Sequence, residues 1–180
     1  MKFIKKLLFV IVALVALVLI TALFVKKDYQ VTRTVVIDAE VSEVYDYISY
    51  LENQEEYAIW QKKDPKTKNT SKGTDGTVGY IHGWNSSHEE VGVGEQEITK
   101  MKLDERIDFA LRFKKPMEIE STAFMTTKKK VAGTEVTWAF EGGSPWPFNI
   151  FFLFMDMDEV LGPDLQQGLD NLKKIIETKE

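Results

Sequence analysis

The chain lacks cysteine altogether and has only two histidines among its 180 residues. Without a cysteine, lipid attachment at a lipoprotein cysteine is excluded. The absence of cysteine is compatible with both reducing and oxidising compartments, so it does not indicate where the protein is located. The two histidines, His82 and His88, stand six positions apart, which is not a recognised spacing for zinc ligands. We therefore expect neither a metal nor another cofactor.

An excess of positive charge is also missing. The net charge of the whole chain is −5. Residues 26–180 lack the three lysines at the start of the chain, so they carry 20 basic and 28 acidic side chains, a net charge of −8. Such a domain repels phosphate backbones, and no basic stripe interrupts it, so nucleic acid is excluded as a partner. Nothing in the sequence identifies a protein partner.

Long repeats and low-complexity tracts are absent, and the length suits one domain with an appendage. The appendage is an apolar run from Leu7 to Val25 in which Thr21 is the only polar residue. As a helix, this run spans roughly 28 Å, close to the thickness of the hydrocarbon core of a bilayer. We expect residues 1–28 to form a transmembrane anchor with a short linker, and residues 29–180 to form the folded domain.

A cleaved signal peptide is the alternative interpretation of this run. Signal peptides have a shorter apolar part, about 7–15 residues, followed by a small-x-small cleavage site. The run here is longer and ends with Leu23, Phe24 and Val25, which favours an uncleaved single-pass anchor. Positive charges on its two sides nearly balance, so the positive-inside rule leans only slightly toward a domain on the extracytoplasmic side.

At the start of the domain, the spacing of apolar residues first has the period of a strand and then that of a helix. Alternating β-branched residues predict a strand over residues 29–37, and apolar spacings of three and four predict an amphipathic helix over residues 41–48. Residues 53–56 resemble a capping box that opens a second short helix. The polar stretch at residues 61–76 is predicted to be a solvated loop.

Five further strand-like runs follow, each bounded by turn residues. They are residues 77–84, 91–103, 106–113, 119–128 and 135–141. Their spacing predicts an antiparallel meander. The chain then ends in a helix with one apolar stripe, which consists of Met157, Leu161, Leu165, Leu169, Leu172 and Ile176. Pro163 should kink this helix or mark its start.

One curved sheet and one striped helix pack naturally with the helix across the concave face of the sheet. This arrangement resembles the START-like helix-grip superfamily, and the sequence is similar to bacterial polyketide cyclase/dehydrase-like (SRPBCC) proteins. The matching stretches are VSEVYDYISYLEN, GTDGTVGY, VGVGEQEITK, RIDFALRFKKP, STAFMTT, GTEVTWAFEG and LFMDMDEVLGPDLQQGLDNLKKI. The resemblance implies an α+β helix-grip fold. It does not imply one activity, because the superfamily includes lipid carriers, ligand sensors and ring-closing enzymes.

Strand parity predicts which side chains face the helix. Residues 107, 109, 111 and 113 share one face of their strand, as do residues 136, 138 and 140, and residues 78, 80, 82 and 84. We expect a cavity for a hydrophobic ligand to be lined by Trp60, Tyr80, His82, Trp84, Phe109, Leu111, Met125, Trp138, Phe140, Leu161 and Leu165. The alternative for each of them is ordinary core packing.

Three functional hypotheses follow. The first is non-catalytic binding of a hydrophobic small molecule or lipid at the membrane, with no catalytic residue. The second is a cyclase or dehydratase in which His82, Glu97 or Tyr80 acts as the acid or base. The third is a membrane-bound interaction module with a filled interior. For His82, hydrogen bonding within the sheet is the more ordinary expectation, and Glu97 with its neighbour Glu95 is expected to face solvent.

Residues 146–154 (WPFNIFFLF) hold five aromatic side chains in nine residues. The ordinary expectation is that this segment packs under the long helix as part of the core. The alternative is that some of its rings touch the membrane interface, where tryptophan is favoured.

Overall fold

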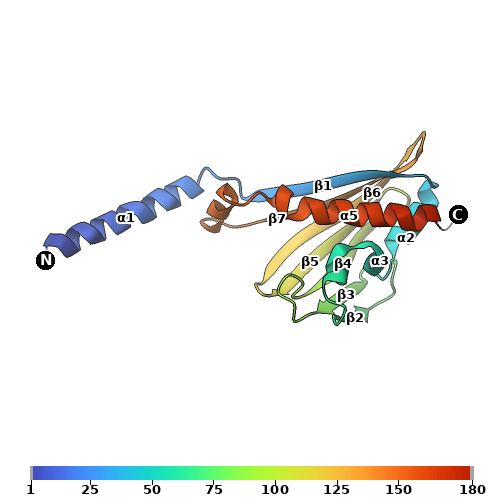
Figure 1. The fold of residues 1–180 in the computed structure, drawn as a ribbon, viewed down its shortest axis with the longest axis horizontal. Coiled ribbons are helices and arrows are strands. Elements are labelled where there is room, and N and C mark those ends of the chain that lie inside the picture. Colours follow the sequence, from blue (N-terminus) through green and yellow to red (C-terminus); the bar gives the residue numbers. More distant parts are fainter. Residues whose placement is uncertain (1, 179–180) are drawn as a thin grey trace.

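A computed structural model describes residues 2–178 as a helical arm attached to a domain of one sheet and several helices (Figure 1). The arm is α1 (Lys2–Ala22), and only Ala22, its last residue, is buried. By length and composition α1 could cross a bilayer, although a signal sequence would have the same properties. The arm extends away from the domain, so it is not a core helix (Figure 1).

Seven antiparallel strands form one sheet in the order β1-β7-β6-β5-β4-β3-β2. Their bounds are β1 Asp28–Ile37, β2 Lys68–Lys72, β3 Ile81–Asn85, β4 Val93–Lys102, β5 Arg106–Lys115, β6 Ile119–Lys130 and β7 Gly133–Gly143. From β2 to β7 each strand pairs with the next one along the chain, and β1 completes the sheet beside β7. The antiparallel meander predicted from the strand spacing is thereby confirmed.

Three short helices, α2 (Val41–Ser49), α3 (Gln54–Tyr57) and α4 (Ile59–Lys63), connect β1 to β2. After β7 the chain makes a 3₁₀ turn, η1 (Phe148–Leu153), and enters the long helix α5 (Met157–Thr178). Figure 1 shows α5 running along β1, with the sheet curving away beneath it. The protein therefore has the predicted α+β helix-grip fold.

Burial follows the predicted parity in the central strands. In β5, Ile107 and Phe109 are buried against the core, and in β7 Val136 and Trp138 are buried in the same way. The pattern in β6 looked mixed in the sequence, but residues 121, 123, 125 and 127 alternate cleanly as its buried positions. Polar Ser121 and Thr127 at two of these positions concealed the alternation.

Several predicted elements were wrong in detail. Residues 61–76 are not entirely loop, because Lys68–Lys72 forms the edge strand β2, in which all five residues are exposed. The strand predicted at residue 77 begins only at Ile81, and Val78 is 59% exposed instead of facing inward. α5 begins six residues before Pro163, so the proline does not mark its start.

The predicted capping box was also wrong. Asn53 has helical backbone angles and makes no side-chain cap. Its Nδ2 instead donates a hydrogen bond to the Tyr47 carbonyl oxygen over 2.9 Å. The expected second helix is divided in two, because Ala58 adopts an extended conformation between α3 and α4.

The start of α5 is fixed to the sheet by Arg33 of β1. The guanidinium donates two hydrogen bonds of 2.8 Å to the two carboxylate oxygens of Asp158, in the first turn of α5. These bonds lower the pKa of Asp158 below its ordinary value of 3.8. A Cβ at position 162 would collide with the Arg33 guanidinium, so Gly162 allows α5 to lie this close to β1.

We predict a pH-dependent effect of the Asp158→Asn substitution. The folded-state pKa of Asp158 is below its unfolded value, so the carboxylate stabilises the fold above the unfolded pKa. This stabilisation is lost as the pH falls through the folded pKa. Urea denaturation in detergent should show the variant less stable than the wild type at neutral pH, and the difference should vanish at acidic pH. Glu159→Gln is the control; a difference independent of pH would contradict the role of this bond.

Candidate functional site

A cavity of about 240 Å³ lies between the sheet and α5. Its walls come from strands β3 to β7, from the short helices and from α5, so it occupies the space that the curved sheet leaves beneath the long helix. It is lined by Leu51, Gln54, Ala58, Trp60, His82, Trp84, Glu90, Val91, Gln96, Leu111, Phe113, Ala123, Trp138, Phe140, Leu161 and Leu165.

Aromatic rings form much of the wall. Trp60 of α4 meets Trp138 of β7 edge-on, with ring centroids 5.8 Å apart. Trp84 of β3 meets Phe113 of β5 edge-on at 5.8 Å, and Phe113 approaches Phe140 at 6.5 Å in a tilted arrangement. Edge-to-face contacts of this kind hold rings in defined positions. This aromatic part of the wall is therefore apolar and held in place by contacts among its own rings.

Two glycines make room for two of these tryptophans. A Cβ at position 94 would lie 2.5 Å from Cζ2 of Trp84, the residue directly across the β3–β4 ladder. A Cβ at position 168 would lie 2.8 Å from Cζ3 of Trp138. Any larger residue would displace an indole from its position, because neither contact leaves space for a methyl group. Gly94 also lies at a register shift of β4, as expected for glycine within a strand.

The apolar stripe of α5 contributes differently along its length. Leu161 and Leu165 line the cavity, while Leu169, Leu172 and Ile176 lie in the closed core beyond it. The same stripe thus forms both a cavity wall and a packed interface with the sheet.

The cavity has polar side chains from α3 and from the neighbouring strands β3 and β4. His82 lies directly opposite Gln96 in the β3–β4 ladder, so both side chains are on one face of the sheet. The Gln96 Nε2 donates a 3.1 Å hydrogen bond to Oε1 of Gln54 in α3. An amide group has more donors and acceptors than this bond uses, which leaves hydrogen-bonding capacity for a ligand.

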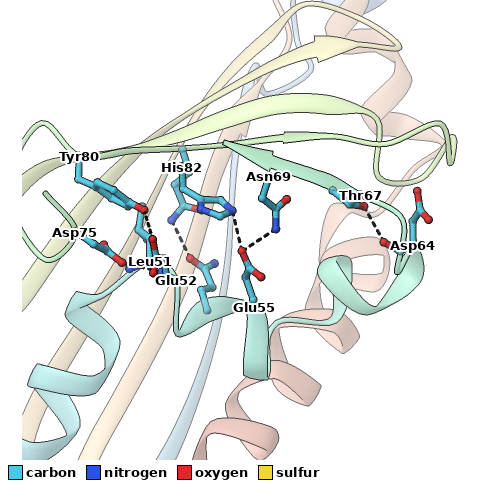
Figure 2. A network of polar contacts seen from close by, with 11 residues as sticks. Leu51, Glu52, Glu55, Asp64, Thr67, Asn69, Asp75, Tyr80 and His82 are labelled. Carbon is cyan, nitrogen blue, oxygen red and sulfur yellow. Dashed lines mark hydrogen bonds and ion pairs between the residues drawn. The ribbon is translucent and has the colours of Figure 1, made fainter. Parts of the chain in front are cut away.

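His82 is buried, with 6% of its surface exposed, and neither ring nitrogen makes a hydrogen bond with the residues that the structure describes. Figure 2 shows the ring directed from β3 toward Glu55 on α3, whose Oε1 is 3.4 Å from Nε2. The same oxygen accepts a 2.7 Å hydrogen bond from Asn69. The expectation that His82 is hydrogen-bonded within the sheet was therefore wrong.

Lys63 connects three elements around the cavity. Its Nζ lies 3.0 Å from Oδ2 of Asp164 in α5 and 3.3 Å from Oε2 of Glu90 in the β3–β4 loop. Because Glu90 and the adjacent Val91 line the cavity, this ion pair helps to hold the loop against the helices.

Tyr80 and Glu97, the other two candidates for acid–base chemistry, do not line the cavity. Tyr80 is buried in the core, and its hydroxyl donates to Oε1 of Glu52 over 3.1 Å (Figure 2). Burial raises the pKa of Tyr80. Glu97 lies on the outer face of β4, where its Oε2 accepts a hydrogen bond from Arg112.

The outer-face pair of Glu95 and Glu97 forms an ion-pair cluster with Arg112 and Lys114. The hydrogen bond from Lys114, followed by that from Arg112, lowers the pKa of Glu95. A general acid that operates near neutral pH requires a raised carboxyl pKa. Neither glutamate lines the cavity, and both lie on the outer face of the sheet, in agreement with the solvent-facing arrangement expected for them.

Eight of the eleven residues predicted for the ligand site line the cavity. They are Trp60, His82, Trp84, Leu111, Trp138, Phe140, Leu161 and Leu165. The other three, Tyr80, Phe109 and Met125, lie in the closed core. The sequence did not predict the lining residues Gln54, Gln96 and Glu90, among others. For Gln96 the only available signal was its position in a strand whose inward face could not be assigned.

Within residues 2–178, no group of three His, Cys, Asp or Glu is placed to hold a metal ion.

Residues 28–177 match a family model described as polyketide cyclase/dehydrase and lipid transport. No curated protein matches the chain. Among solved structures, protein MLL2253 from Mesorhizobium loti aligns with a TM-score of 0.59 and 12% identity over 84% of this chain and 99% of that one. Protein CV1439 from Chromobacterium violaceum aligns with a TM-score of 0.57 and 15% identity over 82% and 96%.

The di-domain ARO/CYC StfQ from the steffimycin biosynthetic pathway also aligns, with a TM-score of 0.61 and 10% identity. The alignment covers 85% of this chain and 52% of StfQ, so this chain corresponds to about half of it. At such low identities these similarities establish a shared fold and not a shared activity.

Proposed function

Because the chain belongs to the polyketide cyclase/dehydrase and lipid-transport family, we propose that its cavity binds a hydrophobic small molecule or lipid that carries a polar group. The observation that carries this proposal is the cavity of about 240 Å³, with apolar walls and the polar side chains of Gln54, His82 and Gln96. Ligand sites commonly combine apolar walls with a few placed polar groups. A filled interior, as a pure interaction module would have, does not agree with this cavity.

Apolar burial would supply most of the binding free energy, at about 25 cal/mol for each Å² of apolar surface removed from water. The polar side chains would orient the ligand, because a carbonyl or hydroxyl group buried without a hydrogen bond costs about 1–3 kcal/mol. The ligand class that fits is therefore mostly hydrocarbon with an oxygen-containing group.

The proposed location is the surface of the membrane that α1 crosses. α1 is almost entirely exposed and apolar, and only five residues separate its last residue, Ala22, from the start of β1 at Asp28. Five extended residues reach at most about 18 Å, so the domain would stay close to the bilayer. The balance of positive charges slightly favours the extracytoplasmic side.

Native mass spectrometry after mild detergent extraction tests for a bound molecule directly. We expect a co-purifying lipid or other hydrophobic compound, released when the domain unfolds. Acetylnaphthalene, which combines an aromatic hydrocarbon with one carbonyl group, is a suitable probe for binding to the emptied site. Failure to bind either a co-purified compound or the probe would contradict the proposal.

A cavity-filling substitution gives a sharper prediction. Ala123 of β6 lines the cavity and is 5% exposed, so Ala123→Phe should occupy the ligand's space. We expect at least a tenfold loss of acetylnaphthalene affinity while the free energy of unfolding changes by less than about 1 kcal/mol, because an existing space accepts the ring. If the interior were a closed core, inserting the ring would lower the free energy of unfolding by about 1–3 kcal/mol. Ala110→Phe, on the outer face of β5, is the matched control and should bind normally.

A second candidate is a cyclase or dehydratase, favoured by one observation. His82 lines the cavity and has the Glu55 carboxylate 3.4 Å from its Nε2, an arrangement that could serve acid–base catalysis. Incubation with a linear polyketone and mass spectrometry would distinguish the two candidates. A carrier returns the compound unchanged. A cyclase releases a cyclic isomer of the same mass, which liquid chromatography separates from the linear compound, and a dehydratase releases a product lighter by one water molecule.

A further inference from the structure

The aromatic segment, residues 146–154, is exposed beside the end of α1 and not packed under α5. In Figure 1 it is the orange-red coil between the arm and the sheet. Its exposed side chains include Phe148 at 59%, Phe151 at 62% and Phe154 at 85%. No residue from Gly143 to Met155 carries a charge. A monomeric soluble protein seldom leaves so apolar a surface in water, so the segment calls for a covering partner.

The segment is hydrogen-bonded to the last turn of α1. Trp146 Nε1 donates to the Leu19 carbonyl oxygen over 3.1 Å. Asn149, which is fully buried, donates through Nδ2 to the carbonyl oxygens of Ala22 and Val25, over 2.7 and 2.9 Å. The last carbonyl groups of a helix have no partner within the helix. In a bilayer they cannot turn to water, so side chains that satisfy them are needed where the helix leaves the hydrocarbon.

The end of α1 extends the same apolar surface. Leu23 is 65% exposed and Phe24 is 85% exposed, immediately before Lys26 and Lys27. Aromatic rings followed by basic residues are the usual composition of a membrane–water interface. The aromatic segment is attached to α1 at Leu19 and Ala22, directly before this predicted membrane–water interface.

A line of rings joins the segment to the ligand cavity. Phe152 meets Tyr29 edge-on at 5.4 Å, and Tyr29 stacks on Phe140 at 6.4 Å. Phe140 is itself a cavity-lining residue. The segment is thus connected to the cavity wall by direct ring contacts.

We propose that the aromatic segment is a second membrane contact, inserted into the interfacial layer of the bilayer that α1 crosses, and that it fixes the orientation of the domain on the membrane. The occupant of this surface is lipid, because the segment is hydrogen-bonded to the end of the apolar helix α1 and its exposed side chains are apolar, as are Leu23 and Phe24 just after α1. The proposal rests on the membrane location of α1, which belongs to the proposed function, and is independent of the ligand.

The absence of cysteine allows single fluorescent labels without background. We suggest V12C in α1, F154C in the aromatic segment and V131C in the β6–β7 turn, each labelled with NBD in the full chain. The proteins are reconstituted in nanodiscs of phosphatidylcholine and phosphatidylglycerol. Residue 131 is fully exposed and lies at the other end of β7, roughly 30 Å from the segment. Nitroxide-labelled lipid and aqueous iodide serve as the two quenchers.

We expect lipid nitroxides to quench labels 12 and 154, and iodide to quench label 131 alone. Adding F148S and F151S should reduce lipid quenching at position 154 at least twofold, with label 12 unchanged. Label 12 quenched by lipid but label 154 by iodide would overturn the second contact while leaving the anchor in place. Label 154 shielded from both quenchers would mean that a protein covers the segment, which also overturns the proposal. Label 12 accessible to iodide would overturn it together with the membrane location.

Discussion

His82→Phe is expected to weaken binding of acetylnaphthalene by about 10- to 100-fold while leaving the domain folded and about as stable as the wild type. Among residues 2–178 neither imidazole nitrogen makes a hydrogen bond, and the ring is buried. The substitution therefore removes only the 3.4 Å contact between Nε2 and Oε1 of Glu55. A buried polar group without a hydrogen bond costs about 1–3 kcal/mol. Its removal offsets the loss of the contact with Glu55, whose Oε1 keeps its hydrogen bond from Asn69, so the free energy of unfolding should change little. If the ligand carbonyl loses its hydrogen bond to His82, a loss of about 1–3 kcal/mol in binding free energy corresponds to about one to two powers of ten in affinity.

The matched probe for this test is ethylnaphthalene, which has the same shape but no carbonyl group. The variant should bind it as tightly as the wild type does, because only the polar interaction is removed. Titration calorimetry gives the affinities, and urea denaturation gives the free energy of unfolding. A variant destabilised by more than about 2 kcal/mol, with its preference for the carbonyl compound intact, would show that His82 supports the fold and not the ligand.

The central strands could be predicted because one face of each is buried in the core. β5 and β7 alternate with period two, and α5 carries its stripe at helical spacing, so the side-chain pattern reported the burial directly. β2 could not be predicted in this way. All of its residues are exposed at the sheet edge, and its place depends on pairing with β3. No pattern in its own five residues records that pairing.

Part of the candidate site was hidden for a related reason. Gln54 and Gln96 are 42 residues apart and meet only because the β3–β4 register places position 96 beside α3. An isolated glutamine in a strand is indistinguishable from a surface residue. The apolar lining was easier to predict, because tryptophans and leucines at inward parities are buried whether they face a cavity or a core.

The aromatic segment illustrates the limit of composition as a guide. Nine residues with five aromatic rings normally indicate core, yet Phe151 and Phe154 are mostly exposed. What distinguishes this segment is its attachment to α1 through Trp146 and Asn149, across 127 positions of sequence. Only the fold reveals that contact, since no local period encodes it.

The α5 stripe provides the second large prediction, because sequence alone cannot tell its cavity-facing leucines from its core leucines. Leu169 is fully buried in the closed core, so Leu169→Ala should lower the free energy of unfolding by about 2–5 kcal/mol. Leu161 is partly exposed and lines the cavity, so its side chain has fewer packing partners to lose. For Leu161→Ala we expect a loss of only about 1 kcal/mol.

The two variants make the same chemical change on the same face of the same helix, eight residues apart. Urea denaturation of each in detergent therefore compares the two ends of the interface between α5 and the sheet. We expect a large loss of unfolding free energy at position 169 and a small one at position 161, because α5 packs tightly on the sheet at one end and leaves a cavity at the other. Equal large costs would mean that the sheet and helix are packed together throughout in solution, and the space proposed for the ligand would not exist.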